Sequence, residues 1–368
     1  MWPLELEVPR LGELARQFTG VSASNLRQVL QLQEKQGGRI GALMLRAGLI
    51  SEDQLTDLLR RQARWVANTR SNDLKHDDFP LSTPMSICMP CFNEAQVLGE
   101  VLTGALAVLP EFLEEFEIVI VDDGSSDQTS EVVRSYAEKD DRVRLVRHEV
   151  NRGYGASVAT GLRAAQGDWV FFTDGDGQFN LLDLPQLLVE LESHDVVVGY
   201  RYDRADHAMR KFNAYGWKMV IRTLMGLKIR DLDCAFKVFP RRVIDKLQLD
   251  AEGACISAEI MCQVARGGVS VAEVPVNHYP RSLGKATGAN LKVITKAFRE
   301  LPIVWKYRKM KPWVWDEVPA DAVKAPVDGP SAEAALADTA THAALDDTLV
   351  DAPKSAKEPA PSSPVKTS

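Results

Sequence analysis

Between residues 84 and 178, short apolar runs alternate with longer segments in which apolar residues recur every three or four positions. Short apolar runs are typical of buried strands, and the longer spacing is typical of amphipathic helices. We expect strands at residues 85–90, 116–121, 143–146 and 169–173, and helices at about 94–109, 129–138 and 156–165. Strands that alternate with helices form mostly parallel sheets, which bind ligands at the carboxyl ends of their strands. The pattern therefore predicts an α/β domain.

The last of these strands ends at two carboxylates, Asp174 and Asp176, which are separated by one glycine. Divalent cations such as Mg²⁺ and Mn²⁺ bind carboxylate oxygens and complete their coordination with water and substrate phosphates. The pair therefore predicts a metal site, with Gln178 close by. A calcium-binding EF-hand loop is excluded because the required glycine and glutamate are missing at their positions. A polar turn that closes a hairpin is the alternative interpretation.

An internal repeat occupies residues 10 to 62, with an offset of 29 residues between its copies. Each copy begins with the pattern Arg-x-Gly-x-Leu and continues with a serine, Ser22 or Ser51, that precedes leucines spaced by four. Serine in this place is typical of a helix N-cap, and the leucines indicate an amphipathic helix. Because neither copy could bury its apolar face alone, we expect a small all-α domain over residues 8–65.

Three further segments differ in composition from both domains. Residues 66–83 are polar and are punctuated by Pro80 and Pro84, which predicts a linker. Residues 289–315 mix tryptophans with many basic side chains, as do amphipathic helices that bind the headgroup region of an anionic membrane. An ordinary helix packed on the α/β domain, broken or kinked at Pro302, is the alternative. Residues 316–368 are rich in Ala, Pro, Asp, Ser and Thr without periodicity, which predicts a disordered acidic tail.

Composition limits the possible classes of protein. The 368 residues are 45% hydrophobic and 26% charged, which suffices for a sizeable core and more than one domain. The sequence lacks an apolar run long enough to span a membrane, and its start lacks the features of a signal peptide. Five scattered cysteines argue against a disulfide framework, so we expect a cytoplasmic protein.

The net charge of −7 is concentrated at the end of the chain. From residue 316 onward, ten acidic residues stand against four lysines, so this tail contributes −6. The rest of the chain is nearly neutral, which argues against general binding of nucleic acid.

Four motifs carry a resemblance to a known family: SICMPCFNE at 86–94, VIVDDGSSD at 119–127, NRGYGA at 151–156 and FFTDGDGQ at 171–178. They resemble the family-2 inverting glycosyltransferases, which implies the nucleotide-diphospho-sugar transferase (A-type) fold for residues 84–288. Within that family, the similarity is greatest to dolichol- and polyprenyl-phosphate sugar synthases, on residues 198–201, 229–237 and 273–276.

The resemblance implies that a nucleotide-diphosphate sugar is the donor. It also implies a set of donor-binding residues: Pro90, Asn93, Glu94, Asp122, Asp123 and Arg152. Asp123 would accept a hydrogen bond from the base or the ribose, and the metal would neutralise the charge that develops on the leaving diphosphate. The alternative for Asn93, Asp122 and Asp123 is that they only cap the helices that follow.

The nature of the acceptor decides which other residues the reaction needs. A lipid phosphate is already ionised and needs cations rather than a base. The resemblance implies four such cations: Arg201, Arg210, Arg281 and Lys285. A saccharide hydroxyl would instead need a base, for which Asp231 is the first candidate and Glu259 the second. For any single arginine, the alternative is an exposed surface charge.

The N-terminal repeat carries a resemblance of its own. Its pattern resembles the N-terminal domain of type II secretion and type IV pilus ATPases, in which such tandem motifs can bind cyclic di-GMP. The implied contacts are Arg10, Gly12, Gln33, Arg39, Gly41 and Gln62. A domain that docks a partner protein or dimerises is the alternative.

Together these features predict a metal-dependent inverting glycosyltransferase that moves a sugar from a nucleotide-diphosphate sugar to a polyprenyl phosphate. We expect it to be peripheral at the cytoplasmic face of the membrane. One alternative is a transferase to a saccharide hydroxyl in polysaccharide or cell-envelope synthesis. Another is a nucleotide-responsive interaction protein whose transferase domain is inactive.

Overall fold

The computed structural model describes residues 8–71, 73–74, 79–202, 226–281 and 291–315. The chain divides after Trp313 into two compact units, and every element named below lies in the first of them. Three of the predictions lie outside the described residues, namely Arg210, Lys285 and the disordered tail at 316–368.

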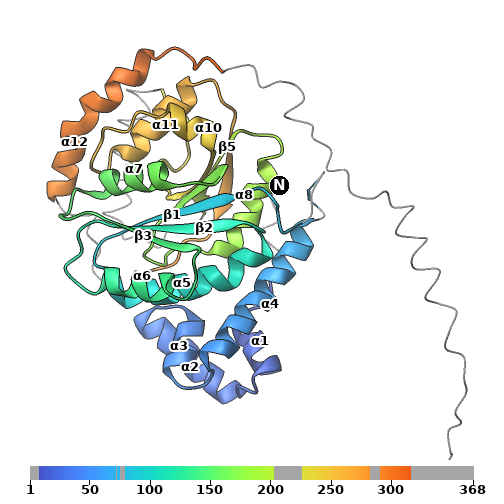
Figure 1. Cartoon of the computed structure of the whole chain (residues 1–368). Helices are drawn as coiled ribbons and strands as arrows, with labels where there is room; N and C mark the ends of the chain where they lie inside the picture. The colour runs from blue at the N-terminus through green and yellow to red at the C-terminus, as the bar shows by residue number, and fades with distance from the viewer. Residues whose placement is uncertain (1–7, 72, 75–78, 203–225, 282–290, 316–368) are drawn as a thin grey trace, which may run out of the picture. The chain divides into compact units, whose positions relative to one another are not determined.

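A seven-stranded sheet forms the centre of the α/β domain (Figure 1). Its strands are β1 (Met85–Cys91), β2 (Phe116–Asp122), β3 (Val143–Arg147), β4 (Trp169–Thr173), β5 (Val196–Arg201), β6 (Phe236–Pro240) and β7 (Val271–Val276). They lie in the order β3-β2-β1-β4-β6-β5-β7. Only β6 among them runs antiparallel to its neighbours. The predicted fold class is confirmed, and the first four strands agree with the predicted bounds to within one residue.

Helices cover both faces of the sheet (Figure 1). They are α5 (Ala95–Val108), α6 (Thr129–Ala137), α7 (Tyr154–Ala164), α8 (Leu184–Glu190), α10 (Arg241–Lys246), α11 (Ile256–Arg266) and α12 (Leu291–Trp305). Short 3₁₀ helices occupy η1 (Leu109–Glu111), η2 (Leu181–Asp183) and η3 (Lys306–Lys309). Helices α5 and α6 lie on one face, and α7, α10 and α11 lie on the other. Burial of one apolar side of each helix against the sheet supplies most of the stability of such a layered domain.

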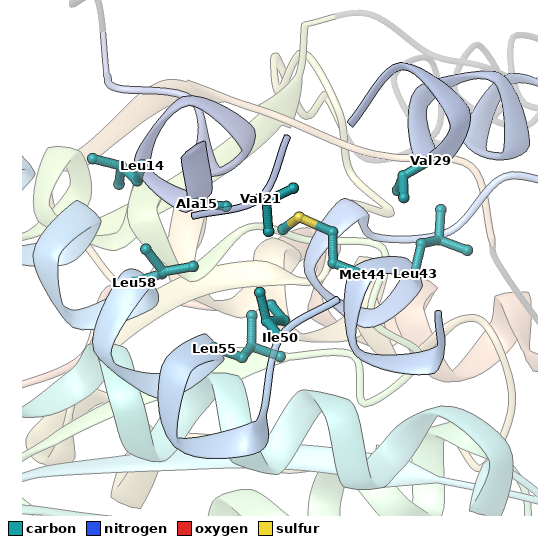
Figure 2. Close-up of a cluster of buried hydrophobic side chains, with 9 residues drawn as sticks. All are labelled: Leu14, Ala15, Val21, Val29, Leu43, Met44, Ile50, Leu55 and Leu58. Carbon is teal, nitrogen blue, oxygen red and sulfur yellow. The ribbon is translucent and has the colours of Figure 1, made fainter. Parts of the chain in front are cut away.

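Four helices form the N-terminal domain: α1 (Leu11–Phe18), α2 (Ala23–Gln36), α3 (Ile40–Arg46) and α4 (Glu52–Ser71). Figure 2 shows their shared core, which is built from both copies of the repeat. The glycine of each copy allows close packing, because a Cβ atom on Gly12 would lie 2.8 Å from Leu26 and one on Gly41 would lie 2.6 Å from Leu55. Side chains at these two positions would force the helices apart.

The N-caps predicted in the repeat are present. The hydroxyl of Ser22 accepts a hydrogen bond from the backbone N–H of Asn25 at 3.1 Å, and that of Ser51 accepts one from Gln54 at 3.2 Å. Each cap satisfies one of the backbone donors that the first turn of a helix leaves without a partner.

One boundary differs from prediction. Helix α4 continues to Ser71, six residues into the predicted linker, because Val66, Ala67 and Arg70 are buried where α4 packs against α5 and α8. There tertiary packing outweighs the local signal.

Helix α12 contains Pro302 and continues to Trp305. Proline removes one backbone hydrogen bond, but burial of Val304 stabilises the last turn. The helix is therefore not broken at Pro302, and a kink there stays a prediction.

None of the helices in the described residues is long and apolar enough to cross a membrane.

Candidate functional site

The carboxyl ends of β1, β2 and β4 bring three of the predicted motifs together. Strand β1 pairs with β2 on one side and with β4 on the other. The turn after β4 packs against the end of β1, because a Cβ atom on Gly175 would lie 2.4 Å from the sulfur of Cys91. This position requires glycine, and it sets Asp174 and Asp176 at the edge where α/β sheets bind ligands.

The two carboxylates have different neighbours. The phenol of Tyr154 donates to Asp174 Oδ1 at 3.0 Å, and Asp176 Oδ1 accepts from the backbone N–H of Gln178 at 3.0 Å. Burial and the nearby charge of Asp176 raise the pKa of Asp174 to about 7. Burial is the larger cause of this rise, so Asp174 lies in a desolvated place where the charge of a second carboxylate repels its own. A divalent cation would relieve that repulsion, so the pair fits the predicted metal site.

The described residues contain no group of three or more His, Cys, Asp or Glu side chains that could hold a metal. A cation at Asp174 and Asp176 would therefore take its other ligands from water and from the phosphates of a substrate. Gln178 has another function in this structure. Its side-chain amide donates to the backbone carbonyl of Tyr279 at 2.9 Å, and the backbone carbonyl of Gln178 accepts from the backbone N–H of Tyr279 at 2.8 Å. Metal ligation by Gln178 stays a prediction.

Arg281 lies between two of the predicted site residues. Its guanidinium forms an ion pair with Glu94 and lies 3.9 Å from Asp176. Burial raises the pKa of Glu94, although the charge of Arg281 opposes the rise. The structure thus brings together a residue predicted to bind the donor, a carboxylate predicted to bind the metal and a cation predicted to bind phosphate. Arg281 follows β7, so a segment more than 100 residues away from Asp176 in the sequence contributes the cation of this site.

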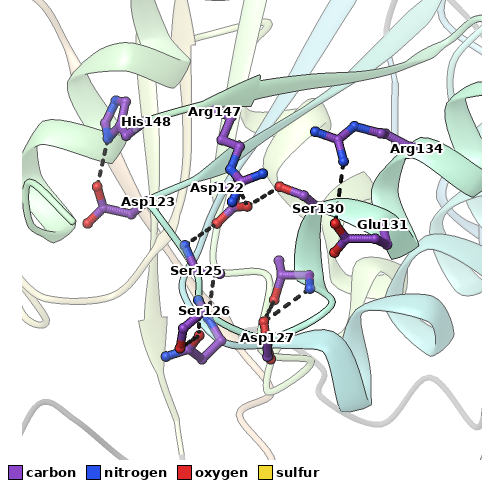
Figure 3. Close-up of polar contacts among 12 residues, drawn as sticks. Asp122, Asp123, Ser125, Ser126, Asp127, Ser130, Glu131, Arg134, Arg147 and His148 are labelled. Carbon is purple, nitrogen blue, oxygen red and sulfur yellow. Dashed lines mark hydrogen bonds and ion pairs between the residues drawn. The ribbon is translucent and has the colours of Figure 1, made fainter. Parts of the chain in front are cut away.

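Asp123 holds the loop that follows β3 (Figure 3). Its carboxylate is within 2.6 Å of His148 Nδ1, and it accepts backbone N–H groups from Arg152 at 3.0 Å and Gly153 at 2.8 Å. The other ring nitrogen of His148 lies 3.0 Å from the hydroxyl of Thr160. Sequence reasoning missed His148, and the only available signal was its place two residues after the strand predicted at 143–146. The side chain of Arg152 is exposed at this edge.

Asp122 and Asn93 bind neighbouring loops rather than capping the helices that follow them, because the N-cap residues of α5 and α6 are Glu94 and Gln128. Asp122 is fully buried and accepts from the backbone of Ser125 at 2.9 Å and from the hydroxyl of Ser130 at the start of α6 (Figure 3). Asn93 has a φ of 56° and accepts from the backbone N–H of Ser126 at 2.9 Å. These bonds tie the loops after β1 and β2 together. Pro90 lies within β1, opposite Val121 of β2. Donor binding by Asp122, Asn93 and Pro90 stays a prediction.

Arg201 and Asp231 form a buried, two-pronged ion pair. The guanidinium donates from Nε to Oδ2 at 2.6 Å and from Nη2 to Oδ1 at 2.8 Å, and the backbone N–H of Arg201 donates to the same carboxylate at 3.2 Å. The charges of Arg201 and of the buried Lys237 both act to lower the pKa of Asp174. Arg201 therefore lies close enough to Asp174 to influence its pKa.

The second candidate base, Glu259, is fully buried away from solvent. Its carboxylate accepts backbone N–H groups from Asp250 at 3.0 Å and Ala251 at 2.8 Å. These hydrogen bonds fix the loop before α11. In the same loop, the backbone carbonyl of Glu252 accepts a hydrogen bond from the N–H of Gly155 at the start of α7. The contacts describe a side chain that organises a loop.

The residues implied as cyclic di-GMP contacts are divided between two environments. Gln33 and Gln62 donate to backbone carbonyls within the N-terminal domain, at Gly38 and Pro9, both at 2.8 Å. Arg10 is exposed at the start of α1. The side chain of Arg39 instead contacts the α/β domain, where it donates to the carbonyls of Gly177 and Phe179. Binding of cyclic di-GMP stays a prediction.

Comparison with known proteins places the α/β domain. Residues 86–248 match the family described as Glycosyl transferase family 2. The chain is 30% identical over 217 residues to the undecaprenyl-phosphate 4-deoxy-4-formamido-L-arabinose transferase of Pseudomonas fluorescens, covering 58% of this chain and 63% of that protein. It is 29% identical over 214 residues to the dolichyl-phosphate beta-glucosyltransferase of Dictyostelium discoideum, covering 52% and 65%. The chain thus spans less than two thirds of the length of both relatives.

Among solved structures, the chain is similar to glucosyl-3-phosphoglycerate synthase from Mycobacterium tuberculosis in complex with Mn²⁺ and uridine-diphosphate-glucose. The TM-score is 0.49 and the sequence identity 17%, over 67% of this chain and 84% of that chain.

Proposed function

Because residues 86–248 form a domain of Glycosyl transferase family 2, we propose that this protein moves a sugar, with inversion, from a nucleotide-diphosphate sugar to a polyprenyl phosphate. The observation that carries the proposal is the convergence of Asp174, Asp176 and Arg281 at the ligand-binding edge of the sheet. Carboxylates for a cation and an arginine for phosphate are the groups that a diphosphate leaving group needs. The names of both relatives, as transferases to undecaprenyl and dolichyl phosphate, support the acceptor.

Asp174 and Asp176 would hold the Mg²⁺ or Mn²⁺ ion. When bound, the ion supplies Lewis-acid stabilisation of the charge that develops on the departing diphosphate. Arg281 is held beside this place by Glu94 and can add a second positive charge to the same phosphates. Asp123 is held in place by His148 and two backbone N–H groups. Its carboxylate would therefore be a fixed hydrogen-bond acceptor for the base or ribose of the donor.

Both candidate bases, Asp231 and Glu259, already accept hydrogen bonds from other residues of the protein, which favours a phosphate acceptor over a saccharide hydroxyl. Asp231 already accepts three hydrogen bonds from Arg201, and hydrogen bonds to the charged form of a carboxylate make it a weaker base. Glu259 is buried and holds a loop. An ionised phosphate attacks without transferring a proton, so it needs neither residue as a base.

We also propose that the protein contacts the cytoplasmic face of the membrane through the end of α12 and η3. Trp305 is 45% exposed, and the guanidinium of Arg308 stacks on its ring at 4.7 Å. Next to them Val304 and Tyr307 are buried, so the segment packs on the domain with one side and presents a basic aromatic surface with the other. Such a surface suits anionic headgroups.

A turnover screen of donors and acceptors tests the proposal. Purified full-length protein is incubated with Mn²⁺ or Mg²⁺ and a panel of UDP- and GDP-sugars, with and without undecaprenyl phosphate, and nucleotide release is measured. We expect release that depends on the lipid phosphate. Release that ignores the lipid but rises with an added saccharide would move the acceptor to a hydroxyl. A complete lack of turnover under all conditions would contradict the proposed activity.

A further inference from the structure

One arginine of the N-terminal domain reaches the turn that carries the metal carboxylates. Arg39 is the N-cap residue of α3. Its Nη2 donates to the carbonyl of Gly177 at 3.0 Å and to that of Phe179 at 2.8 Å. These carbonyls lie 138 and 140 residues further along the chain, in the turn directly after Asp176. A single guanidinium nitrogen thus binds two backbone carbonyls of this turn.

Helix α5 provides the path for this side chain. A Cβ atom on Gly104 would lie 3.7 Å from Arg39 Nη1, so the guanidinium crosses α5 where the helix has no side chain. The turn itself presses on the same helix, because a Cβ atom on Gly177 would lie 3.2 Å from Val97 and 3.3 Å from Val101. Gly177 has a φ of 73°, which favours glycine. The turn is therefore clamped between α5 and Arg39.

Two carboxylates, Glu100 and Asp176, lie near the buried guanidinium of Arg39 and favour its charged form. Burial lowers the pKa of Arg39, and the negative charges of Glu100 and Asp176 oppose that change. Glu100 also forms an ion pair at 3.8 Å with Arg46, which lies seven residues after Arg39 at the end of α3. Arg39 and Arg46 therefore both lie near Glu100 of α5, and Arg39 also donates to the turn that follows Asp176.

We propose that Arg39 is a positioning residue for the transferase reaction, through which the N-terminal helical domain sets the place of the Asp176 carboxylate. The inference rests on the proposed function, because it is the metal at Asp174 and Asp176 that would need this accuracy. Sites carried on loops are less well placed than sites on helices or strands, and displacement by about 1 Å can lower a rate by about a hundredfold. A charged hydrogen bond to each of two carbonyls removes much of that freedom.

The test compares Arg39→Ala with Arg46→Ala in the full-length protein. Both variants remove a cation from α3 and from its contact with α5, but only the first removes the bonds to the turn. Hydrogen exchange followed by mass spectrometry measures the amides of residues 174–179. In parallel, turnover is measured against Mn²⁺ concentration and against lipid concentration, and thermal unfolding shows that each variant is folded.

We expect Arg39→Ala to speed exchange in residues 174–179 by about tenfold, as the loss of a charged hydrogen bond should. It should also lower kcat by about tenfold or more and raise the Mn²⁺ concentration for half-maximal turnover, with little change in KM for the lipid. Arg46→Ala should leave the exchange of this segment unchanged. A merely stabilising role would change the unfolding temperature without this local and metal-dependent signature.

The outcome that would overturn the proposal is equal exchange in residues 174–179 for wild type and Arg39→Ala. If Arg39→Ala does not fold, Arg39→Lys takes its place, because it keeps the charge but shortens the reach, and it should give an intermediate effect. The exchange measurement does not depend on turnover. Failure of the proposed function would appear as an inactive wild type, whereas failure of this inference would appear as unchanged exchange.

Discussion

The two copies of the N-terminal repeat have the same local structure, but the first arginine of each copy meets a different environment. Gln33 of the first copy donates to the carbonyl of Gly38, and Gln62 of the second donates to that of Pro9. These four positions are related by the same offset of 29 residues, so each copy closes onto the start of the other. The residues that face inward therefore remain equivalent.

The arginines are not equivalent. Arg10 is exposed, and its backbone N–H donates to the carboxylate of Glu13 at 3.2 Å within α1. Arg39 instead donates to the turn beside Asp176. Equivalent sequence makes equivalent structure only where the copies pack on each other. At the outer surface, the neighbouring domain decides what a residue does.

The largest effect should come from the double substitution Asp174→Asn and Asp176→Asn. It should abolish turnover, a loss of about a hundredfold or more, because the carboxylates that would hold the metal are gone. Circular dichroism should show that the fold survives. The turnover of this variant gives the value expected when the metal site is removed completely, and the smaller loss of turnover in Arg39→Ala is compared with it. Activity equal to that of the wild type would remove the basis for the metal site.

A pH titration of stability reports on the α/β domain alone. Burial raises the pKa of Asp174 and of Asp183 to about 7, well above 3.8. The folded protein therefore binds more protons than the unfolded chain between about pH 4 and pH 7, so the free energy of unfolding should fall as pH rises through this window. Thermal unfolding from pH 5 to pH 8 without metal measures the slope. Asp183→Asn should flatten it, and Mn²⁺ at pH 8 should raise the unfolding temperature of the wild type but not of the Asp174 and Asp176 double variant.

Substitution of the repeat glycines separates stability from positioning. Gly12→Val and Gly41→Val should each lower the free energy of unfolding by about 1–3 kcal/mol, because both side chains would collide with a leucine. Gly41 lies next to the start of α3, so only Gly41→Val should also speed amide exchange in residues 174–179. Urea unfolding and hydrogen exchange measure the two effects. The same increase of exchange in Gly12→Val would contradict a specific path through α3.

The helix caps should show the equivalence of the two copies. Ser22→Ala and Ser51→Ala each remove one cap hydrogen bond, so each should cost about 1 kcal/mol in the free energy of unfolding. Urea unfolding of the two variants should therefore give closely similar values. A clear difference between them would show that the two copies are not equivalent at their caps.

The smallest effect is expected for Arg10→Ala. Its side chain is exposed, so the free energy of unfolding should change by less than about 0.5 kcal/mol. Exchange in residues 174–179 should be unchanged, in contrast to Arg39→Ala. Any increase there would mean that the first copy also acts on the site.

The sequence alone determined the elements and the chemistry at their ends. The apolar runs predicted β1 to β4 to within one residue, because burial between two layers of helices demands a continuous apolar strand. The Asp174 and Asp176 pair was recognisable because carboxylates directly after a buried strand have a clear chemical use. The repeat was recognisable because its two copies can be compared with each other.

Only the tertiary structure decided which side chains meet. Asp231 was predicted as a base and Arg201 as a phosphate ligand, yet the two are bound to each other across 30 residues of sequence. Arg39 was predicted from the repeat as a nucleotide contact, yet it bonds to carbonyls about 140 residues away. The periodicity of a sequence reports the local environment of each residue. The partner of a charged side chain depends instead on how distant elements pack, and that is set by the whole fold.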